Sequence, residues 1–292
     1  MTGAVAGLDV GGTKTHVRVV DRQGRTLRDR VVPTSDWARR SDEERGRALA
    51  DLVTEHVLPL GASAVVAGVH GCDSEYQRQA LETPLRAVVA RSAVVNDAEL
   101  VVPAAGYDSG TGVIAGTGAC ATSRDAGGRA FSVGGWGWVL GDEGSAAAIV
   151  RDAAREVLRA WDEHREDPLT DVLLSRFDLG HPHQLGWFLT SEAPEVWASA
   201  ASEVFAAETQ GSAAAAAVLD KQLAGLLNLL RAVDRRGGDL SVVALAGGVF
   251  TGQPVYAARF AEGAQEVAGE AEVVVLAAPP VVGAVRLASR LP

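Results

Sequence analysis

An aspartate followed closely by a glycine turn is the first segment of the sequence whose residue types could do chemistry. Asp9 lies at the end of an apolar stretch, and the turn comprises Gly11, Gly12, Thr13, Lys14 and Thr15. Glycines let backbone N–H groups approach an anion, as in phosphate-binding nests. The carboxylate could stand beside the Mg²⁺ of a nucleotide, through water because Mg²⁺ keeps much of its hydration shell. The alternative is an ordinary β-turn with a surface aspartate.

A second turn of small residues, Gly116, Thr117 and Gly118, also follows an apolar stretch. Two such turns, one in each half of the chain, could hold a polyphosphate from both sides. With Ala121 the spacing also fits a loose G-x-G-x-x-A pattern. A dinucleotide site needs a helix next, however, and a strand-like segment follows here. The sequence also lacks the G-x-x-x-x-G-K-[ST] pattern of a P-loop.

Gly247 and Gly248 stand between another apolar stretch and a predicted helix. Paired glycines at that point would let an adenine ring lie flat on the backbone. Close packing at the start of a helix explains them equally well.

Asn96 and Asp97 end a short apolar stretch. A carboxylate there can accept the proton of a sugar hydroxyl while a phosphoryl group is transferred, which is one of the few chemical roles the protein has in such reactions. Aspartate suits the cap of a helix equally well. The residues alone therefore leave both roles open.

A glycine-rich segment over residues 134–145 precedes a predicted helix. The backbone at Gly135 and the carboxylate of Asp142 suit the hydroxyl groups of a sugar, with Trp136 as an apolar wall. The alternative is a glycine-rich hinge that ends in a capped helix, with Trp136 and Trp138 in the core.

The hydrophobic pattern places these motifs at the ends of strands. In the first half we expect strands over residues 4–10, 15–21, 26–32, 64–69 and 93–96, and helices over 41–57 and 75–90. In the second half we expect strands over 112–117, 119–124, 129–133, 240–246 and 272–276, a helix-rich stretch over 145–236, and helices from 254 and over 280–291. The halves read as two copies of one α/β architecture, ribonuclease-H-like, with mixed sheets and a helical insertion in the second copy.

Composition bounds the class of protein. At roughly 150 residues per domain, 292 residues predict about two domains. A formal net charge of −10 and the lack of a polybasic segment argue against nucleic-acid and membrane-surface partners. The uncharged stretch over residues 273–285 is interrupted by prolines and too short to span a bilayer. Two cysteines, Cys72 and Cys120, are too few for a disulfide scaffold. We expect a cytoplasmic protein.

Taken together, N-D-A, G-T-G, G-G-W-G and G-D-E-G-S, in that order over residues 96–148, resemble the N-acetylglucosamine kinase branch of the BadF/BadG/BcrA/BcrD ATPase family. The resemblance covers nearly the whole chain. It implies the actin-like ATPase fold, with residues 1–104 and 280–292 in one domain, 105–279 in the other, and a nucleotide and sugar cleft between them. It also implies ATP, Mg²⁺, an amino-sugar substrate and, because the family often forms dimers, a homodimer.

The resemblance assigns a role to each motif. Asp97 looks like the general base for the sugar 6-hydroxyl, and Asp9 looks like the Mg²⁺ element. The residues that look like nucleotide contacts are Gly11, Gly12, Thr13, Lys14, Thr15, Gly116, Thr117, Gly118, Gly247 and Gly248. The residues that look like sugar contacts are Ser35, Asp36, Asn96, Asp97, Thr117, Gly135, Trp136 and Asp142.

Two departures from the family pattern leave the sugar open. Ser35 or Asp36 stands where the eukaryotic kinases carry asparagine, and Ala119 stands where the family has serine. N-acetyl-D-glucosamine is the leading substrate, while Asp36 could favour the free amine of glucosamine or another hexosamine. A non-catalytic sugar sensor is an alternative, although it would not need Asp97. An activator of a radical dehydratase is disfavoured because the cysteines do not pair. His70 is expected to line the cleft without a catalytic role.

Overall fold

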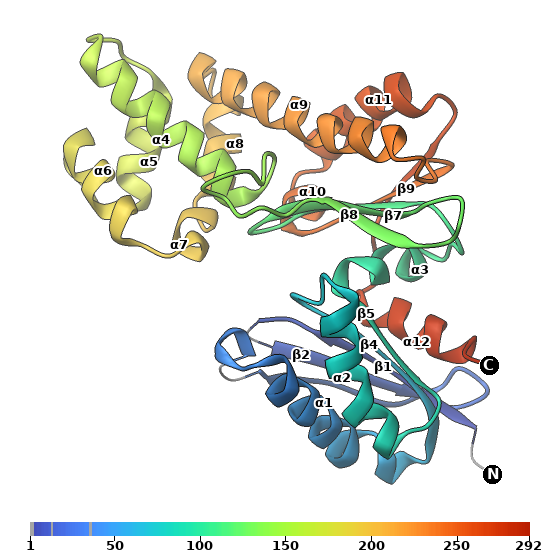
Figure 1. The fold of residues 1–292 in the computed structure, drawn as a ribbon. Helices are drawn as coiled ribbons and strands as arrows, with labels where there is room; N and C mark the ends of the chain where they lie inside the picture. The colour runs from blue at the N-terminus through green and yellow to red at the C-terminus, as the bar shows by residue number, and fades with distance from the viewer. Residues whose placement is uncertain (1–2, 13, 35–36) are drawn as a thin grey trace. The chain divides into compact units, whose positions relative to one another are not determined.

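The computed structural model describes residues 3–12, 14–34 and 37–292 (Figure 1). The chain divides into two compact units. Unit 1 comprises Met1–Ser109 and Leu276–Pro292, and unit 2 comprises Gly110–Val275. The chain therefore passes between units at 109/110 and 275/276, where the sequence predicted boundaries at 104/105 and 279/280.

Unit 1 contains a five-stranded mixed sheet in the order β3-β2-β1-β4-β5. Its strands are β1 (Ala4–Val10), β2 (Lys14–Val20), β3 (Thr26–Pro33), β4 (Ala62–Val69) and β5 (Ser92–Asn96). The first three strands form an antiparallel meander, and β4 runs parallel to both β1 and β5. All five strands predicted for the first half of the chain are present, with ends that differ by at most two residues.

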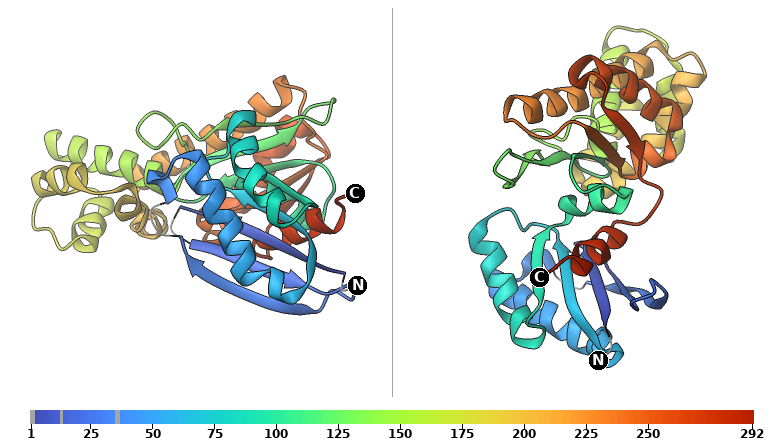
Figure 2. Two further views of the ribbon diagram at one scale, coloured as in Figure 1. Left: turned by 60° about the horizontal axis from the view of Figure 1, so that its bottom comes forward. Right: turned by 90° about the vertical axis from the view of Figure 1, so that its right-hand side faces the viewer.

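Helices pack on both faces of this sheet (Figure 2). Alternate residues of β1, such as Leu8 and Val10, share a core with Leu49 of α1 (Asp42–His56) and Leu85 of α2 (Glu75–Val88). A capping box starts α1: Ser41 Oγ accepts a hydrogen bond from the Glu44 backbone N–H, and the Glu44 carboxylate accepts one from the Ser41 N–H.

The opposite face of the sheet packs against α12 (Val281–Ser289). Gly7 makes this contact close, because a Cβ at that position would lie 2.5 Å from the Val285 nitrogen. Short elements complete unit 1: η1 (Trp37–Arg39), η2 (Leu58–Leu60), η3 (Asp97–Leu100) and α3 (Val101–Ala105).

Unit 2 repeats the architecture of unit 1. Its strands are β6 (Thr111–Ala115), β7 (Ala119–Arg124), β8 (Ala130–Gly134), β9 (Val242–Ala246) and β10 (Glu272–Val275). Their order is β10-β9-β6-β7-β8, the same arrangement of first to fifth strand as in unit 1, with the same parallel and antiparallel pairs. The predicted fold class, two ribonuclease-H-like domains with mixed sheets, is confirmed.

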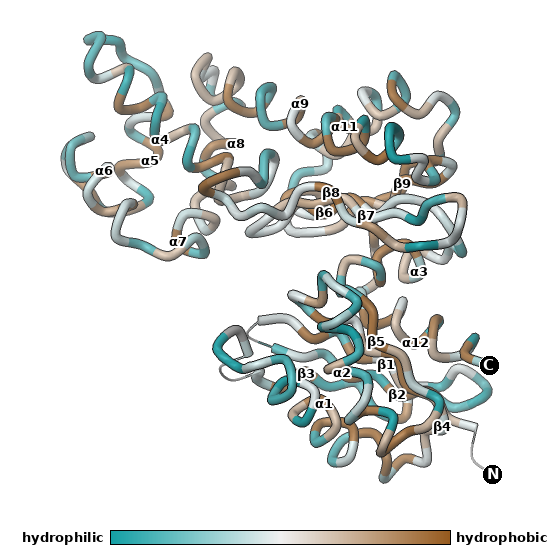
Figure 3. The backbone as a smooth tube through the Cα atoms, in the orientation of Figure 1, coloured by the Kyte–Doolittle hydropathy of each residue, from teal (hydrophilic) through white to brown (hydrophobic). Residues whose placement is uncertain are grey.

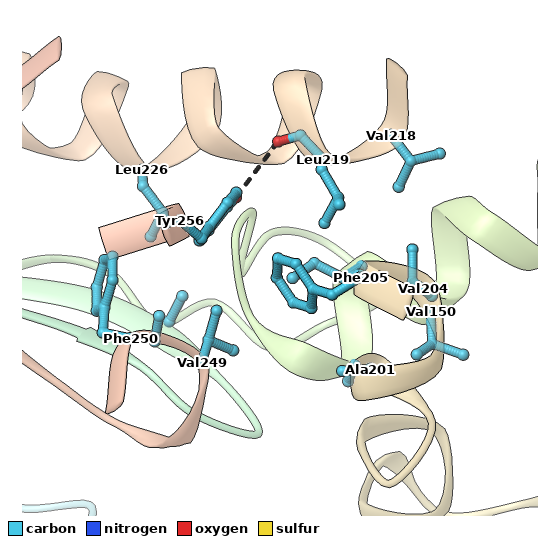
Figure 4. Packing of buried hydrophobic residues seen from close by; sticks show 14 of the residues in the cluster. Val150, Ala201, Val204, Phe205, Val218, Leu219, Leu226, Val249, Phe250 and Tyr256 are labelled. Atoms are coloured by element: carbon cyan, nitrogen blue, oxygen red, sulfur yellow. Dashed lines mark hydrogen bonds between the residues drawn. The ribbon is translucent and has the colours of Figure 1, made fainter. Parts of the chain in front are cut away.

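The helices of unit 2 are α4 (Ala146–Asp162), α5 (Pro168–Arg176), α6 (Pro182–Ser191), α7 (Pro194–Ala198), α8 (Ala201–Thr209), α9 (Ala213–Arg235), α10 (Gly248–Gly252) and α11 (Pro254–Ala268). The unit has one continuous apolar core, in which the Phe205 and Tyr256 rings meet edge to face at 5.1 Å (Figure 4). The buried Tyr256 hydroxyl donates to the Leu219 carbonyl at 3.3 Å, which satisfies its polar end.

One helix of the described part of the chain, α9, has the length and composition of a membrane span. Leu219, Leu226 and Leu230 of α9 lie fully buried in the core of unit 2. The tube in Figure 3 also alternates in hydropathy along α9, as expected for a helix with one core-facing side. We therefore assign α9 to the core of unit 2.

Candidate functional site

The hairpin between β1 and β2 carries the first predicted phosphate element. The Gly11 N–H donates to the Lys14 carbonyl at 2.9 Å and closes the turn. Lys14 and Gly12 are exposed, and nothing lies within 4 Å of a Cβ built on Gly12. Thr15 is instead buried, with its hydroxyl 2.7 Å from that of Thr34. The turn thus presents open backbone and one ammonium group, while Thr15 anchors its base. Thr13 lies outside the described residues.

The carboxyl ends of the parallel strands align beside this hairpin. Val10 pairs with Val69, and Val69 pairs with Asn96. The residues around these positions, Asp9, His70 and Asp97, therefore lie along one edge of the sheet. In open α/β sheets that edge is where ligands bind.

Asn96, not Asp97, caps the short helix η3. The side-chain oxygen of Asn96 accepts from the Ala98 N–H at 2.9 Å, and the Glu99 carboxylate accepts from the Asn96 N–H at 3.2 Å. Asp97 Oδ1 also accepts from Ala98 N–H, at 3.0 Å. Its Oδ2 lies 3.4 Å from His70 Nδ1. The capping role that competed with general-base chemistry in the sequence thus belongs to Asn96.

The side chain of Asn96 is held on its other atom as well. Its Nδ2 donates to the Cys72 carbonyl at 3.3 Å and to Asp73 Oδ1 at 2.8 Å. Both polar atoms of Asn96 are therefore engaged by unit 1 itself, and its sugar contact stays a prediction.

Charges at this edge of the sheet interact. Burial, and then the carboxylate of Asp97, raise the pKa of Asp9 to about 6, against the opposing effect of His16 and Lys14. The hydrogen bond to Asp97 raises the pKa of His70 above its ordinary value, although burial opposes it. From its position at the end of a strand, His70 was predicted only to line the cleft. The contact between His70 and Asp97 was not predicted.

The chemistry of Asp9 fits a hydrated Mg²⁺. Among the described residues, no three His, Cys, Asp or Glu side chains gather as a ready metal site. Mg²⁺ commonly takes one or two protein carboxylates and completes its shell with water and phosphate oxygens. At Asp9 the effects of burial and of Asp97 outweigh those of His16 and Lys14 on the pKa. A cation beside this carboxylate would favour its charged form, so the residue is suited to hold one.

In unit 2 several predicted residues gather around the hairpin between β6 and β7. The Gly116 N–H donates to the Gly118 carbonyl at 2.9 Å, and the Ala119 carbonyl accepts from Gly135 N–H at 2.9 Å. A Cβ on Gly247 would lie 2.8 Å from the Gly116 nitrogen and still closer to the preceding carbonyl. The second phosphate element, a sugar-loop glycine and the adenosine element are thus direct neighbours.

Asp142 lies against the same hairpin. A Cβ on Gly118 would come within 2.9 Å of Asp142 Oδ2, so only glycine leaves the carboxylate where it is. Asp142 Oδ1 accepts from the Gly137 N–H at 3.2 Å. The residue has a φ of 58°, in the left-handed region that few side chains adopt. Burial raises the pKa of Asp142 above its ordinary value, despite hydrogen bonds from the backbone.

The two tryptophans of this segment lie in different surroundings. Trp138 packs on Trp197 with ring centroids 4.8 Å apart, as in the core alternative. Trp136 is 76% exposed, which leaves its ring free to act as a wall for a ligand. Thr117 is exposed at the tip of the hairpin, and nothing lies within 4 Å of a Cβ on Gly248. The predicted sugar contacts Ser35 and Asp36 lie outside the described residues.

Comparison with known proteins places this geometry among sugar kinases in fold. A candidate N-acetylglucosamine kinase from Chromobacterium violaceum has a TM-score of 0.70 at 22% identity, with 98% of both chains covered. A ROK family glucokinase from Streptomyces griseus, solved with glucose and AMPPNP, has a TM-score of 0.59 at 20% identity, with 99% of this chain and 100% of that chain covered. Identities this low show the shared fold alone.

Curated relatives are similar in sequence over part of their length. The N-acetylmuramic acid/N-acetylglucosamine kinase of Clostridium acetobutylicum is 32% identical over 176 residues, which is 57% of each chain. The N-acetyl-D-glucosamine kinase of Dictyostelium discoideum is 29% identical over 191 residues, 59% of this chain and 60% of the relative. The matches thus span less than two thirds of these relatives. The profile of the BadF/BadG/BcrA/BcrD ATPase family matches residues 6–288, so the chain belongs to this family.

Proposed function

We propose that this protein transfers the γ-phosphoryl group of ATP to an amino sugar, with N-acetyl-D-glucosamine as the leading substrate and O6 as the acceptor atom. The observation that carries the proposal is the arrangement of Asp97. Asn96 caps η3, and although Oδ1 of Asp97 also accepts from the Ala98 N–H, its Oδ2 lies toward His70 at the same sheet edge as Asp9. That pair offers a proton acceptor and a carboxylate suited to a cation, which are the groups that this reaction asks of a protein.

Each predicted residue has a part in the proposal. Asp97 accepts the proton of the sugar hydroxyl. The backbone of the two hairpins, and Lys14, bind phosphate oxygens. Asp142 and Gly135 bind sugar hydroxyls. Mg²⁺, held through Asp9 and water, supplies neutralisation of phosphate charge when bound.

The names of the relatives support an amino sugar. One is named for both N-acetylmuramic acid and N-acetylglucosamine, and another for N-acetyl-D-glucosamine. Because the 35–36 segment lies outside the described residues, recognition of the N-acetyl group against a free amine rests on the sequence alone. Glucosamine and other hexosamines therefore remain alternative substrates, and a sugar sensor of the same fold remains the alternative to an enzyme.

A coupled assay of ADP release tests the proposal. The protein is given ATP, Mg²⁺ and, one at a time, N-acetylglucosamine, glucosamine, N-acetylmannosamine, N-acetylmuramic acid and glucose. We expect ADP release that depends on N-acetylglucosamine, and mapping of the product should place phosphate on O6. Release with glucosamine alone would favour the free-amine reading of Asp36. Binding of a sugar without ADP release from any of the panel would contradict the kinase and favour the sensor.

Homodimer formation and a cytoplasmic location are also part of the proposal, on the strength of the family resemblance and the composition. Sedimentation equilibrium would test the dimer, and fractionation of the source cells would test the location.

A further inference from the structure

Asp152, in the second turn of α4, is a buried carboxylate held by side chains from two helices. Its Oδ2 accepts hydrogen bonds from Lys221 Nζ and Gln222 Nε2, each at 2.8 Å. Its Oδ1 accepts from Arg151 Nε and Arg155 Nη1, each at 3.1 Å. Only 4% of the side chain is exposed. Burial opposes ionisation, but Lys221 and Arg151 hold the pKa of Asp152 below its ordinary value. The group is therefore a buried, compensated anion.

Two of the partners of this carboxylate reach onward to one loop. Gln222 Oε1 accepts from the Gly144 N–H at 2.6 Å. Arg151 Nη1 donates to the Gly141 carbonyl at 3.3 Å. Gly141 and Gly144 lie on either side of Asp142. The partners of the buried anion therefore hold the backbone before and after the predicted sugar-binding carboxylate by hydrogen bonds.

The backbone conformation of Asp142 has to be stabilised by its surroundings. Its φ of 58° is unfavourable for a residue with a side chain. Gly144 also has a positive φ, of 87°, and packs directly on the side chain of Leu226, one turn along α9 from Gln222. A loop with two left-handed residues in three positions keeps one shape only if its surroundings fix it.

The loop also carries the other predicted sugar contacts. Arg151 donates a second hydrogen bond to the Trp138 carbonyl. That residue follows Trp136, the exposed ring, by two positions. The same guanidinium therefore ties down the backbone between the predicted aromatic wall and the predicted carboxylate.

We propose that Asp152 and Gln222 are positioning residues that hold the loop over residues 135–142 in its sugar-binding shape. The proposal rests on the proposed function, because it takes the ligand of this loop to be the sugar. Neither side chain carries out chemistry on the substrate. Each acts through the backbone that presents Asp142.

Swapping the carboxylate and the amide between positions 152 and 222 distinguishes a positioning role from a merely structural one. Asp152→Asn removes the anion, and Gln222→Glu sets two carboxylates against each other. The double variant restores one carboxylate, one amide and the hydrogen bond between them. We expect each single variant to raise the KM for the sugar roughly tenfold or more, since small misplacements cost that much. The KM for ATP should stay within about twofold, and the double variant should regain most of the sugar affinity.

Asp167→Asn is the matched control. Asp167 is also a carboxylate of unit 2 that joins two helices, through hydrogen bonds to Ser212 Oγ and to the Leu169 N–H. It lies in the helical insertion, and its hydrogen-bond partners among the described residues, Leu169, Ser212 and Ala214, belong to that insertion as well. This variant should lower thermal stability without a selective change in the KM for the sugar.

A second readout keeps the proposal separate from the proposed function. Amide hydrogen exchange of the peptide that covers residues 134–145 reports the order of the loop without any turnover. Faster exchange in Asp152→Asn and Gln222→Glu, but not in Asp167→Asn, is the expected result. If the wild type phosphorylates no sugar, the proposed function fails while this measurement still decides the positioning role. Unchanged amide hydrogen exchange in the single variants would overturn the positioning role. A proportional rise of both KM values with a fall in turnover, and no rescue by the double variant, would also overturn it.

Discussion

Asn96 and Asp97 are neighbours with the same tendency to cap helices, and the structure gives them different roles. Asn96 takes the capping hydrogen bond from the Ala98 N–H and is held by two further acceptors. Asp97 keeps one carboxylate oxygen toward His70. The division of roles follows from position, because the residue at the N-cap has an extended backbone and the next residue is already helical.

Asp97→Asn should lower turnover by roughly 10²–10⁴-fold, because a general base contributes about that much to proton transfer. Binding of the sugar, measured by calorimetry, should change little, since the amide has nearly the same shape. Asp51→Asn is the control, because Asp51 is an exposed carboxylate on α1 of the same unit. Turnover of Asp97→Asn close to that of the wild type would remove this residue from the mechanism.

His70→Asn should change the dependence of stability on pH. The pKa of His70 is raised in the folded protein, first by its hydrogen bond to Asp97. A raised histidine pKa means that the protonated form stabilises the fold. That contribution is complete below the unfolded value of about 6.5 and is lost as pH rises through the folded pKa. The destabilisation by His70→Asn, measured by urea unfolding, should therefore be larger at pH 5.5 than at pH 8.5.

The charged neighbours of His70 determine how this result is interpreted. Asp73 raises the pKa of His70 and Arg45 lowers it, in addition to the effect of Asp97. His183→Asn serves as a control, because it removes an imidazole of unit 2 whose ring packs against His181 and Trp161. Equal destabilisation by His70→Asn at both pH values would show that the imidazole and Asp97 are not coupled.

The candidate residues were predictable where a local pattern carried them. Glycine turns after apolar stretches located Gly116, Gly118 and Gly247, and the structure brings these together around one hairpin. The roles of Asp152 and Gln222 were not predictable. They are 70 positions apart, and a buried polar side chain in a helix gives no local sign of its partner.

At the scale of elements, the β1–β2 hairpin and the β6–β7 hairpin occupy equivalent positions in the two units. Each joins the first and second strands of a sheet with the same strand order. Periodicity predicted most strands, because half-buried strands alternate and glycines mark their ends. It missed the short 3₁₀ turns, whose few residues carry no period, and it started the helix after Gly248 at residue 254, whereas α10 already covers Gly248–Gly252. Within the predicted helix-rich stretch, Pro182 starts α6 with His181 as its cap.

Gly247 and Gly248 should respond differently to alanine. A Cβ on Gly247 would collide with the Ala115 carbonyl, and its φ of 95° suits glycine alone. Gly247→Ala should therefore lower stability by roughly 1–3 kcal/mol. Gly248 has open space, so Gly248→Ala should leave stability nearly unchanged but raise the KM for ATP, where the added methyl group meets the nucleotide. Thermal unfolding and steady-state kinetics of both variants check this. An unchanged KM for ATP in Gly248→Ala would remove that residue from the nucleotide site.

At the scale of the whole molecule, unit 1 is discontinuous in sequence. Its terminal helix α12 packs on β1 and also on η3, which begins with Asp97. Gly283 allows this approach, since a Cβ there would collide with the Leu100 carbonyl and lie 2.9 Å from the Ala104 nitrogen. The last helix thus supports the segment that carries the proposed base.

Gly283→Ala should loosen unit 1 alone, because relief of the collision moves α12 away from η3. We expect the free energy of unfolding of unit 1 to fall by roughly 1–3 kcal/mol. Amide hydrogen exchange should become faster in β1 and β4 and stay unchanged in β6 and β9. Gly252→Ala is the control, since nothing lies within 4 Å of a Cβ at that position. Equal effects of the two substitutions would indicate that Gly283 does not set the packing of α12.

The placement of α12 has a consequence for synthesis on the ribosome. The sheet of unit 1 emerges first, yet the face that includes Val5, Val66 and Val95, on which Leu100 of η3 also packs, is fully covered only when α12 arrives. Between the first segment of unit 1 and α12 the ribosome must make the 166 residues of Gly110–Val275, which takes roughly 10–30 s at ordinary rates of translation. During that interval unit 2, which is continuous, can complete its fold. The strands made earliest are therefore closed last, and the nascent chain offers an apolar sheet face to chaperones for the whole of that wait.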